Sequence, residues 1–244
     1  MKYSYLIVGA GFTGAVIARE IADKLNEPTL IIDRRNHISG NAFDHYDKSG
    51  VLIHEYGPHI FHTNSHQVWE FLSKFTEWNP YEHRVIGKIG KEHIPIPFNF
   101  SSIETMFSSK EANIIKSHLL EEHGNEVKVP ILNLMQSKNS FVKELADYIY
   151  TNIFFNYTKK MWDLEPQELD PAVLSRVPIQ IGYDDRYFHD QYQSMPKNGY
   201  TKMFQKILDH PNIEVKLRTH FKDISNPKEF KKIIYTGPID EYFD

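Results

Sequence analysis

Two short hydrophobic runs frame an amphipathic segment at the beginning of the chain. Residues 5–8 form an apolar run of the length that is typical of a buried parallel strand. Apolar residues then recur at helical spacing, and a second apolar run covers residues 29–32. The pattern predicts a strand, a helix and a second strand, in the order that a dinucleotide-binding fold requires.

Three glycines stand between the first strand and the helix. Gly9, Gly11 and Gly14 have the spacing G-x-G-x-x-G, which allows a tight turn, a close approach to a pyrophosphate and close packing of the helix. Asp33 ends the second apolar run, where a carboxylate can accept hydrogen bonds from ribose hydroxyls. Together these features favour a nucleotide site; the alternative is a glycine-rich turn without a ligand.

The remaining hydrophobic pattern predicts a mixture of helices and strands. A hairpin is predicted at residues 84–96. Pro95 lies in its second arm and Pro97 follows it, which makes that arm an edge strand or the end of one. Three segments of residues 100–155 look helical and nothing there has a βαβ pattern, which indicates a helical insertion into the nucleotide-binding domain. The predicted helices are 67–75, 103–107, 110–123, 140–155 and 200–208, and the later strands are 183–188, 213–217 and 232–235.

Composition and charge narrow the class of protein. The 244 residues are 41% hydrophobic and carry a formal net charge of −4, which argues against nucleic acid or an anionic membrane as a partner. The chain has no cysteine, so disulfides and thiolate chemistry are excluded. We expect no signal peptide and no membrane insertion, because no apolar run is long enough to span a bilayer, and we expect a cytoplasmic protein.

Two polar segments leave alternatives open. The loop at residues 34–41 either wraps the phosphates or sugar of a cofactor or is an ordinary connection. His59, His62 and His66 have a spacing that suits one face of a helix, but Gly57 and Pro58 favour a loop there. A metal site is therefore less expected than histidines that are hydrogen-bonded in the wall of a pocket.

Aromatic residues and one arginine gather between residues 157 and 187. Tyr157, Trp162 and Tyr187 offer rings for stacking on uracil, and Arg176 offers a guanidinium for a pyrophosphate. Aromatic residues that follow a helix are also common in hydrophobic cores. The set by itself does not decide between a substrate site and a core.

Several longer motifs identify a resemblance to a known family. The chain is similar to bacterial, flavin-dependent UDP-galactopyranose mutases in residues 8–14 with Gly40 and Asn41, in residues 56–63, in residues 157–162, and in residues 195–201 with 235–240. The motifs at 56–63 and 157–162 are far more specific than the glycine motif. The resemblance runs from the first residue to the last.

The resemblance implies an isomerase that uses FAD. Members of the family interconvert UDP-galactopyranose and UDP-galactofuranose for cell-surface polysaccharide synthesis, with no net redox change. Only the reduced flavin is active, and the reaction is thought to pass through an adduct between flavin N5 and galactose. The resemblance also implies a homodimer.

The family's functional residues can be assigned to matching positions in this chain. The implied catalytic residues are His62, Trp162 and Arg176. The implied FAD-binding residues are Gly9, Gly11, Phe12, Gly14, Asp33, Arg34, Gly40, Asn41, His59 and Ile60, and no metal is implied. The implied substrate-binding residues are His83, Phe154, Tyr157, Thr158, Trp162, Arg176 and Tyr187.

The chain departs from the family pattern in a few residues and in length. Met161 and Asp163 flank the tryptophan where glutamine and glycine are usual, Ser39 replaces a common glycine, and His83 replaces an asparagine. The resemblance implies that the chain stops before much of the sheet domain and the second flavin motif. We therefore expect a shortened chain or a fragment.

The predicted fold class is α/β: a Rossmann-like FAD-binding domain with an inserted helical bundle and a partial antiparallel sheet. We expect the FAD-binding domain at residues 1–80 and, incomplete, at 196–244. A hairpin of the sheet domain is expected at 81–97, the helical insertion at 98–165, and a mobile loop with a sheet strand at 166–195. The alternatives to a mutase are an FAD- or NAD-dependent oxidoreductase of the same fold and an inactive, truncated nucleotide-binding fragment.

Overall fold

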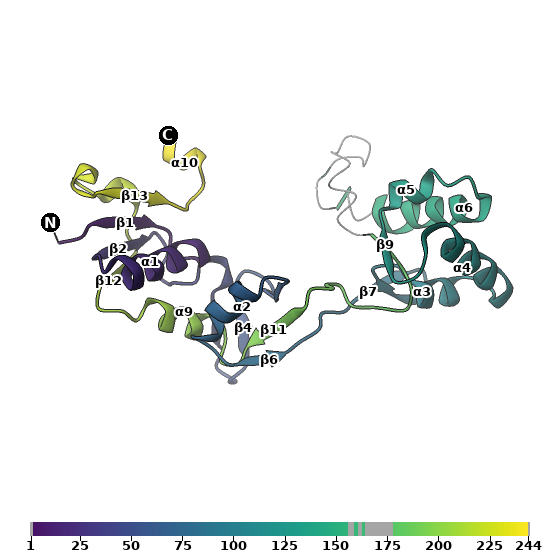
Figure 1. Ribbon diagram of the computed structural model, residues 1–244, viewed down its shortest axis with the longest axis horizontal. Helices are drawn as coiled ribbons and strands as arrows, with labels where there is room; N and C mark the ends of the chain where they lie inside the picture. Colours follow the sequence, from purple (N-terminus) through teal and green to yellow (C-terminus); the bar gives the residue numbers. More distant parts are fainter. Residues whose placement is uncertain (1, 156–158, 161–162, 164–177, 244) are drawn as a thin grey trace. The chain divides into compact units, whose positions relative to one another are not determined.

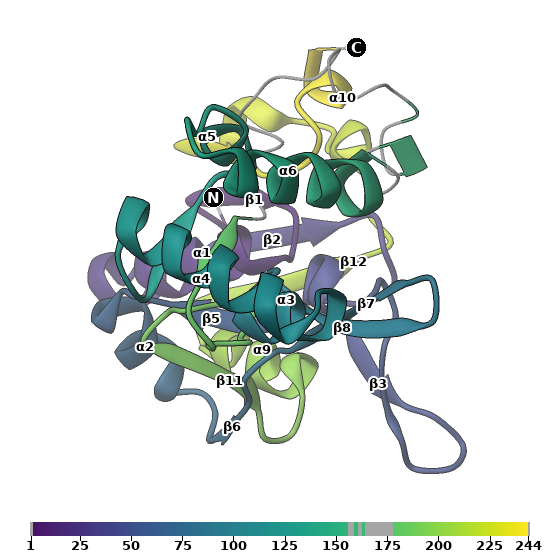
Figure 2. The ribbon, with the colours of Figure 1, turned by 90° about the vertical axis from the view of Figure 1, so that its right-hand side faces the viewer.

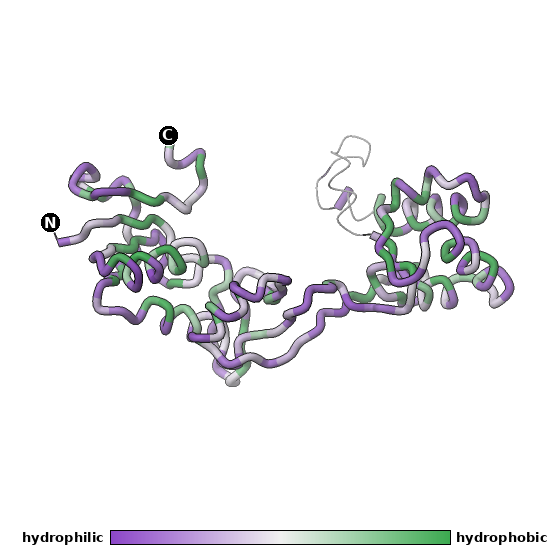
Figure 3. Tube along the Cα trace, viewed as in Figure 1, coloured by the Kyte–Doolittle hydropathy of each residue, from purple (hydrophilic) through white to green (hydrophobic). Residues whose placement is uncertain are grey.

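The chain forms two compact units. The structure is a computed structural model that describes residues 2–155, 159–160, 163 and 178–243. One unit contains residues 1–81 and 190–244, and the other contains residues 82–189. Figure 1 labels their helices and strands, and Figure 3 shows hydrophobic residues, in green, concentrated in the elements of both units.

A four-stranded parallel sheet is the centre of the first unit. Its order is β12 (Ile213–Leu217), β2 (Thr29–Asp33), β1 (Tyr5–Val8) and β13 (Lys232–Tyr235). Val8, the last residue of β1, pairs with Ile32 on one side and with Tyr235 on the other, so neighbouring strands end at the same edge. Three strands have the predicted bounds, and β2 extends one residue further than predicted, to Asp33. The predicted α/β class with a parallel sheet is confirmed.

Each face of this sheet is covered by a different layer. Ile7 and Ile31 point to α1 (Phe12–Leu25) and α9 (Tyr200–Leu208) and belong to one core with the fully buried Phe204. The alternate residues of β1 and β2 pack instead against residues 221–230, which contain the short 3₁₀ turns Phe221–Asp223 and Pro227–Glu229. Both faces are buried, which explains the continuous apolar runs of these strands. Figure 2 shows β1 and β2 from a second direction.

Asp44 fixes the start of α9 from a distant part of the chain. The helix has no capping side chain of its own, since Gly199 stands before Tyr200. The buried Asp44 carboxylate accepts hydrogen bonds from the backbone N–H of Tyr200 at 2.6 Å and of Thr201 at 2.7 Å. A Cβ on Gly199 would overlap this carboxylate, so the glycine at this turn is required by a close approach.

Short strands complete the first unit. β5 (Phe61–Thr63), β11 (Tyr192–Pro196) and β6 (Trp78–Pro80) form an antiparallel sheet, with β11 in the middle. β3 (Asp44–Tyr46) pairs with β4 (Leu52–His54). The helical segments not yet described are η1 (Gly40–Ala42), α2 (His66–Ser73) and α10 (Asp240–Phe243).

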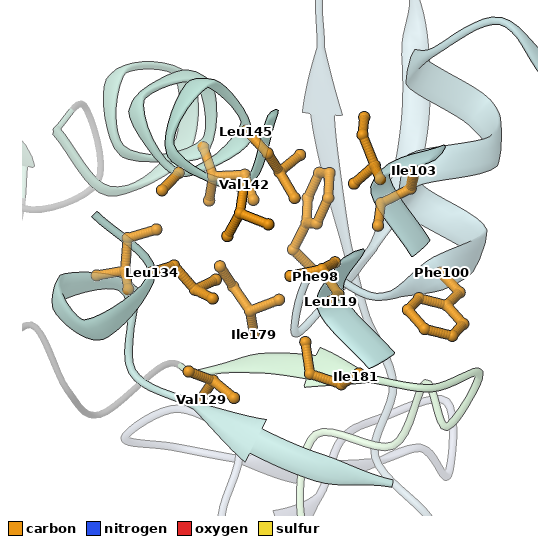
Figure 4. Packing of buried hydrophobic residues seen from close by; sticks show 14 of the residues in the cluster. Phe98, Phe100, Ile103, Leu119, Val129, Leu134, Val142, Leu145, Ile179 and Ile181 are labelled. Atoms are coloured by element: carbon orange, nitrogen blue, oxygen red, sulfur yellow. The ribbon is translucent and has the colours of Figure 1, made fainter. Parts of the chain in front are cut away.

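The second unit is mainly helical. It contains the predicted hairpin, β7 (Val85–Ile89) and β8 (Glu92–Ile96), and the antiparallel pair β9 (Val127–Val129) and β10 (Ile179–Ile181). Its helices are α3 (Phe100–Met106), α4 (Ser109–His123), α5 (Ile131–Met135), α6 (Ser140–Ile149) and a π-helical turn at Tyr150–Phe155. Figure 4 shows the core in which side chains of these helices meet those of β9 and β10.

The strand predicted at residues 183–188 is not formed. The backbone there bends, because the Asp184 carboxylate accepts hydrogen bonds from the backbone N–H and the side chain of Arg186. The flanking residues form β10 and β11 instead, and the segment pairs with the residues before β7 at an isolated bridge between Arg84 and Arg186. Side-chain hydrogen bonds of this kind compete with a strand ladder, which sequence alternation cannot detect. None of the described helices is long and apolar enough to span a bilayer.

Candidate functional site

A cavity of about 560 Å³ lies where the parallel strands end. This size is in the range of small-molecule and cofactor sites. Eight of the predicted cofactor-binding residues line it, whereas Gly14 and Ile60 are not among the lining residues. The eight are Gly9, Gly11, Phe12, Asp33, Arg34, Gly40, Asn41 and His59.

Glycines allow close backbone packing around this cavity. A Cβ on Gly14 would overlap the carbonyl oxygen of Gly9, so Gly14 serves the close packing of α1 on the turn. Gly40 has φ +56°, and its Cβ would lie 3.0 Å from the Cα of Gly11. Two backbone segments therefore meet across the cavity at a separation that only glycine permits.

The beginning of α1 faces the same space. Its N-cap residue is Gly11, and no side chain caps this first turn in the described part of the chain. The unpaired N–H groups and the helix dipole together favour a bound anion. The structure thus supports the nucleotide interpretation of the glycine motif over a turn without a ligand.

Asp33 has a structural task in addition to the one expected from the sequence. Its Oδ2 accepts a hydrogen bond from the Ala10 N–H at 2.8 Å, and its Oδ1 accepts one from the Arg35 N–H at 2.9 Å. The carboxylate therefore holds the glycine turn and the following loop in place. Each oxygen keeps a second lone pair that can accept a hydrogen bond from a ribose hydroxyl.

The two arginines beside Asp33 have different partners. Arg34 binds the Glu241 carboxylate through Nη1, at 2.7 Å and 2.9 Å from its two oxygens, and this pair raises the pKa of Arg34. Arg35 donates to the Asn41 amide oxygen at 2.8 Å and lies 4.6 Å from the ring centre of Tyr56. These partners of Arg35 are neutral, so neither of them offsets its positive charge, which is available for a ligand phosphate.

Ser39 is a buried lining residue whose hydroxyl lacks a hydrogen-bond partner among the described residues. It has φ +77°, a left-handed conformation that a glycine adopts without strain. A buried unpaired hydroxyl is unfavourable unless a ligand or water bonds to it. Ser39 was noted in the sequence only as a departure from a glycine, and the missing partner supports a polar ligand at this place.

Further lining residues come from distant loops that the sequence did not single out as site residues. Thr219, His220 and Phe221 follow β12, and the Thr219 N–H donates to the Asp33 carbonyl at 2.9 Å. Tyr235 ends β13 and residues 236–238 follow it, and Thr236 donates through its hydroxyl to the Val8 carbonyl at 2.8 Å. The parallel strand order could have indicated both loops, because ligands bind outside the carboxyl ends of such strands.

The three histidines of the 59–66 segment have separate environments. His59 lines the cavity, and its Nδ1 lies 3.1 Å from the Gly57 carbonyl oxygen. His62 is on β5, where its Nδ1 lies 2.8 Å from Asp190 Oδ2, and it is not among the residues that line the cavity. His66 Nδ1 lies 2.8 Å from the Tyr192 hydroxyl. No group of three potential metal ligands occurs within the described ranges.

Three of the predicted substrate-binding residues lie in the described part of the second unit. The ring centres of His83 and Tyr187 are 5.7 Å apart, and the Tyr187 N–H donates to the His83 carbonyl. Phe154 is buried in the helical core. Tyr157, Thr158, Trp162 and Arg176 lie outside the described residues.

A compact ion-pair network adjoins the aromatic pair. Arg186 contacts the Asp184 carboxylate through Nε and Nη2, the latter at 2.7 Å. Mainly for this reason the pKa of Asp184 is lowered to about 2. Arg84 in turn binds Asp185 and Glu82. The network holds the segment that carries Tyr187 against the segment that carries His83.

The parallel sheet, the glycine turn and the cavity define a Rossmann-like domain of the dinucleotide-binding class. The family model described as NAD(P)-binding Rossmann-like domain matches residues 7–75. The family model described as UDP-galactopyranose mutase matches residues 152–244. The resemblance found in the motifs is thus confirmed: the chain is similar to the UDP-galactopyranose mutases.

Individual relatives agree with these matches. The chain is 37% identical to a probable UDP-galactopyranose mutase of Klebsiella pneumoniae, over 98% of this chain and 61% of that protein. It is 35% identical to a dTDP-fucopyranose mutase of Escherichia coli, over 98% of this chain and 64% of that protein. A crystal structure of reduced UDP-galactopyranose mutase matches the fold with a TM-score of 0.59 and 14% identity, over 88% of this chain and 48% of that one. The chain thus spans about three fifths of the length of these curated relatives.

Proposed function

We propose that this chain, by itself or as part of a longer protein, is an FAD-dependent mutase that interconverts the pyranose and furanose forms of a nucleotide-linked sugar. UDP-galactopyranose is the first candidate substrate. The observation that carries the proposal is similarity over 98% of the chain to mutases that act on nucleotide sugars. The homodimer, the cytoplasmic location and the role in polysaccharide synthesis stay predictions from the sequence.

The cavity residues suit the adenosine diphosphate part of FAD. The N–H groups at the start of α1, together with Arg35, would hold the pyrophosphate. The Asp33 carboxylate would accept hydrogen bonds from the ribose, and the unpaired Ser39 hydroxyl would donate to an oxygen of the ligand. When bound in reduced form, FAD would supply the nucleophile for the sugar rearrangement.

The residues of the second unit would bind the nucleotide sugar. The Tyr187 N–H donates a hydrogen bond to the His83 carbonyl, and the rings of the two residues are in contact. Such a fixed pair would orient the substrate with little further loss of side-chain freedom. Trp162 and Arg176 are assigned to the sugar and the pyrophosphate by resemblance alone.

The E. coli relative makes dTDP-fucopyranose a second candidate substrate, because its identity to this chain is nearly the same as that of the Klebsiella protein. The two candidates differ in the base, the nucleoside sugar and the hexose. An oxidoreductase of the same fold is less supported, since both relatives are named mutases.

The first test is binding of FAD to the purified chain. Gly40→Ala would place a Cβ at 3.0 Å from the Gly11 Cα, between two residues that line the cavity. Gly50→Ala is a matched control: Gly50 also has positive φ, but nothing lies within 4 Å of its added Cβ. We expect Gly40→Ala to weaken FAD binding by at least about tenfold, as for a lost phosphate contact. Equal affinities in the two variants would contradict the placement of FAD in this cavity.

The second test is anaerobic turnover with dithionite and added FAD. Chromatography would follow the conversion of UDP-galactofuranose to UDP-galactopyranose and, in parallel, of the corresponding dTDP-fucose pair. We expect one of the two pairs to be converted, with loss of the reaction in Trp162→Ala and without reductant. If FAD binds but neither pair is converted, this chain is not a mutase on these substrates.

A further inference from the structure

The charges at the end of β2 are arranged in a way that FAD binding alone does not require. Asp33 and Arg34 are consecutive at this edge, and both line the cavity. In Rossmann-like folds the acid in this position contacts the ribose 2′-hydroxyl, whereas a nearby arginine accommodates a 2′-phosphate. This chain has both groups, so the partner of the arginine decides which ligand is preferred.

Glu241 is that partner. It also lines the cavity, and both of its carboxylate oxygens lie within 2.9 Å of Arg34 Nη1. The charge of Arg34 is thereby neutralised, and Asp33, Arg34 and Glu241 together carry one net negative charge. A phosphate on the ribose, with a charge of about −1.5 to −2 near pH 7, would be repelled or would have to displace Glu241.

Arg35 provides an internal comparison. It follows Arg34 directly, but its contacts are the Asn41 amide and the Tyr56 ring, both neutral. One arginine of the pair therefore keeps its charge and the other is neutralised by a carboxylate of a distant segment. A cavity that favoured phosphate at both places would not place Glu241 on Arg34.

We propose that Glu241, by occupying Arg34, makes the cavity select adenine dinucleotides with a free ribose 2′-hydroxyl over those with a 2′-phosphate. Asp33 accepts from the hydroxyl, and Glu241 removes the cation that a 2′-phosphate would need. This inference rests on the proposed function, because it assumes that the adenosine part of a dinucleotide binds in this cavity.

The experiment compares ADP with its 2′-phosphorylated form by calorimetry, on the full chain. The wild type is expected to bind ADP more tightly. Glu241→Gln is expected to reduce the preference for ADP by about fivefold, the scale of an exposed ion pair. Asp240→Asn is the matched control: it removes the same charge from the same short helix, but Asp240 does not line the cavity.

A double variant separates the proposed cause from a general charge effect. In Arg34→Met/Glu241→Gln, the gain in affinity for the 2′-phosphorylated ligand should disappear, because the freed cation is absent. If Glu241→Gln strengthens the binding of both ligands equally, or of neither, Glu241 is not a specificity residue. If the wild type binds FAD but prefers the 2′-phosphorylated nucleotide, the inference fails while the proposed function stands. Absence of ADP and FAD binding would overturn both.

Discussion

Ser39 gives the sharpest prediction about stability and binding together. Two features of this residue are unfavourable in the protein without its ligand: φ of +77° and a buried hydroxyl without a described partner. The left-handed conformation costs a non-glycine residue roughly 1 to 2 kcal/mol. An unpaired buried hydroxyl costs about 1 to 3 kcal/mol.

Ser39→Gly removes both costs at once. Glycine loses more backbone freedom on folding, which offsets roughly 0.5 to 1 kcal/mol of the gain. We therefore expect the free energy of unfolding to rise by about 1 to 4 kcal/mol, which corresponds to roughly 2 to 16 °C in Tm for a chain of this size. Ser39→Ala removes only the hydroxyl and keeps the strained backbone, so its gain should be smaller.

The assay is thermal unfolding followed by circular dichroism, with and without FAD. If the Ser39 hydroxyl bonds to the ligand, FAD should stabilise the wild type more than it stabilises Ser39→Gly, because stabilisation by a ligand rises with the logarithm of its affinity for the folded state. A ligand-free Ser39→Gly protein that melts below the wild type would refute the reasoning about strain. An equal effect of FAD on both proteins would refute the ligand contact.

Two further predictions concern charged groups outside the cavity. Asp44→Ala should lower the free energy of unfolding by about 3 kcal/mol, because it removes the acceptor of two N–H groups at the start of α9, one buried and one partly buried. Asp44→Asn keeps one acceptor and should lose about half as much in denaturant titration; equal losses would contradict this account. For Asp184, the folded-state pKa of about 2 lies below the ordinary value of 3.8, so its ion pair stabilises the fold above about pH 4 and is lost as the pH falls towards 2. Asp184→Asn should lower the free energy of unfolding by about 1 to 2 kcal/mol at pH 7. It should also flatten the pH dependence of this free energy between pH 4 and 2, and an unchanged pH dependence would rule out this role of Asp184.

The sequence by itself determined the nucleotide-binding half of the fold. The strands at 5–8 and 29–32 could be predicted because each is a short apolar run buried on both faces. The edge strands at 213–217 and 232–235 are only partly buried, and their apolar residues were enough to predict them. The glycine turn could be predicted because the spacing of its glycines reflects local backbone requirements. The resemblance to the mutases likewise depended on contiguous motifs, which a single chain displays directly.

Only the tertiary structure decided which residues complete the cavity. Glu241 and Thr219 are close to Asp33 because β12 joins the same sheet as β2 and because α10 follows β13; nothing in their local sequence indicates this. The bend at residues 183–188 arises from the bond between Asp184 and Arg186, and the missing partner of Ser39 appears only when its surroundings are known. Hydrophobic periodicity reports burial along one element, whereas contacts between charges and hydroxyls depend on which distant elements the fold brings together.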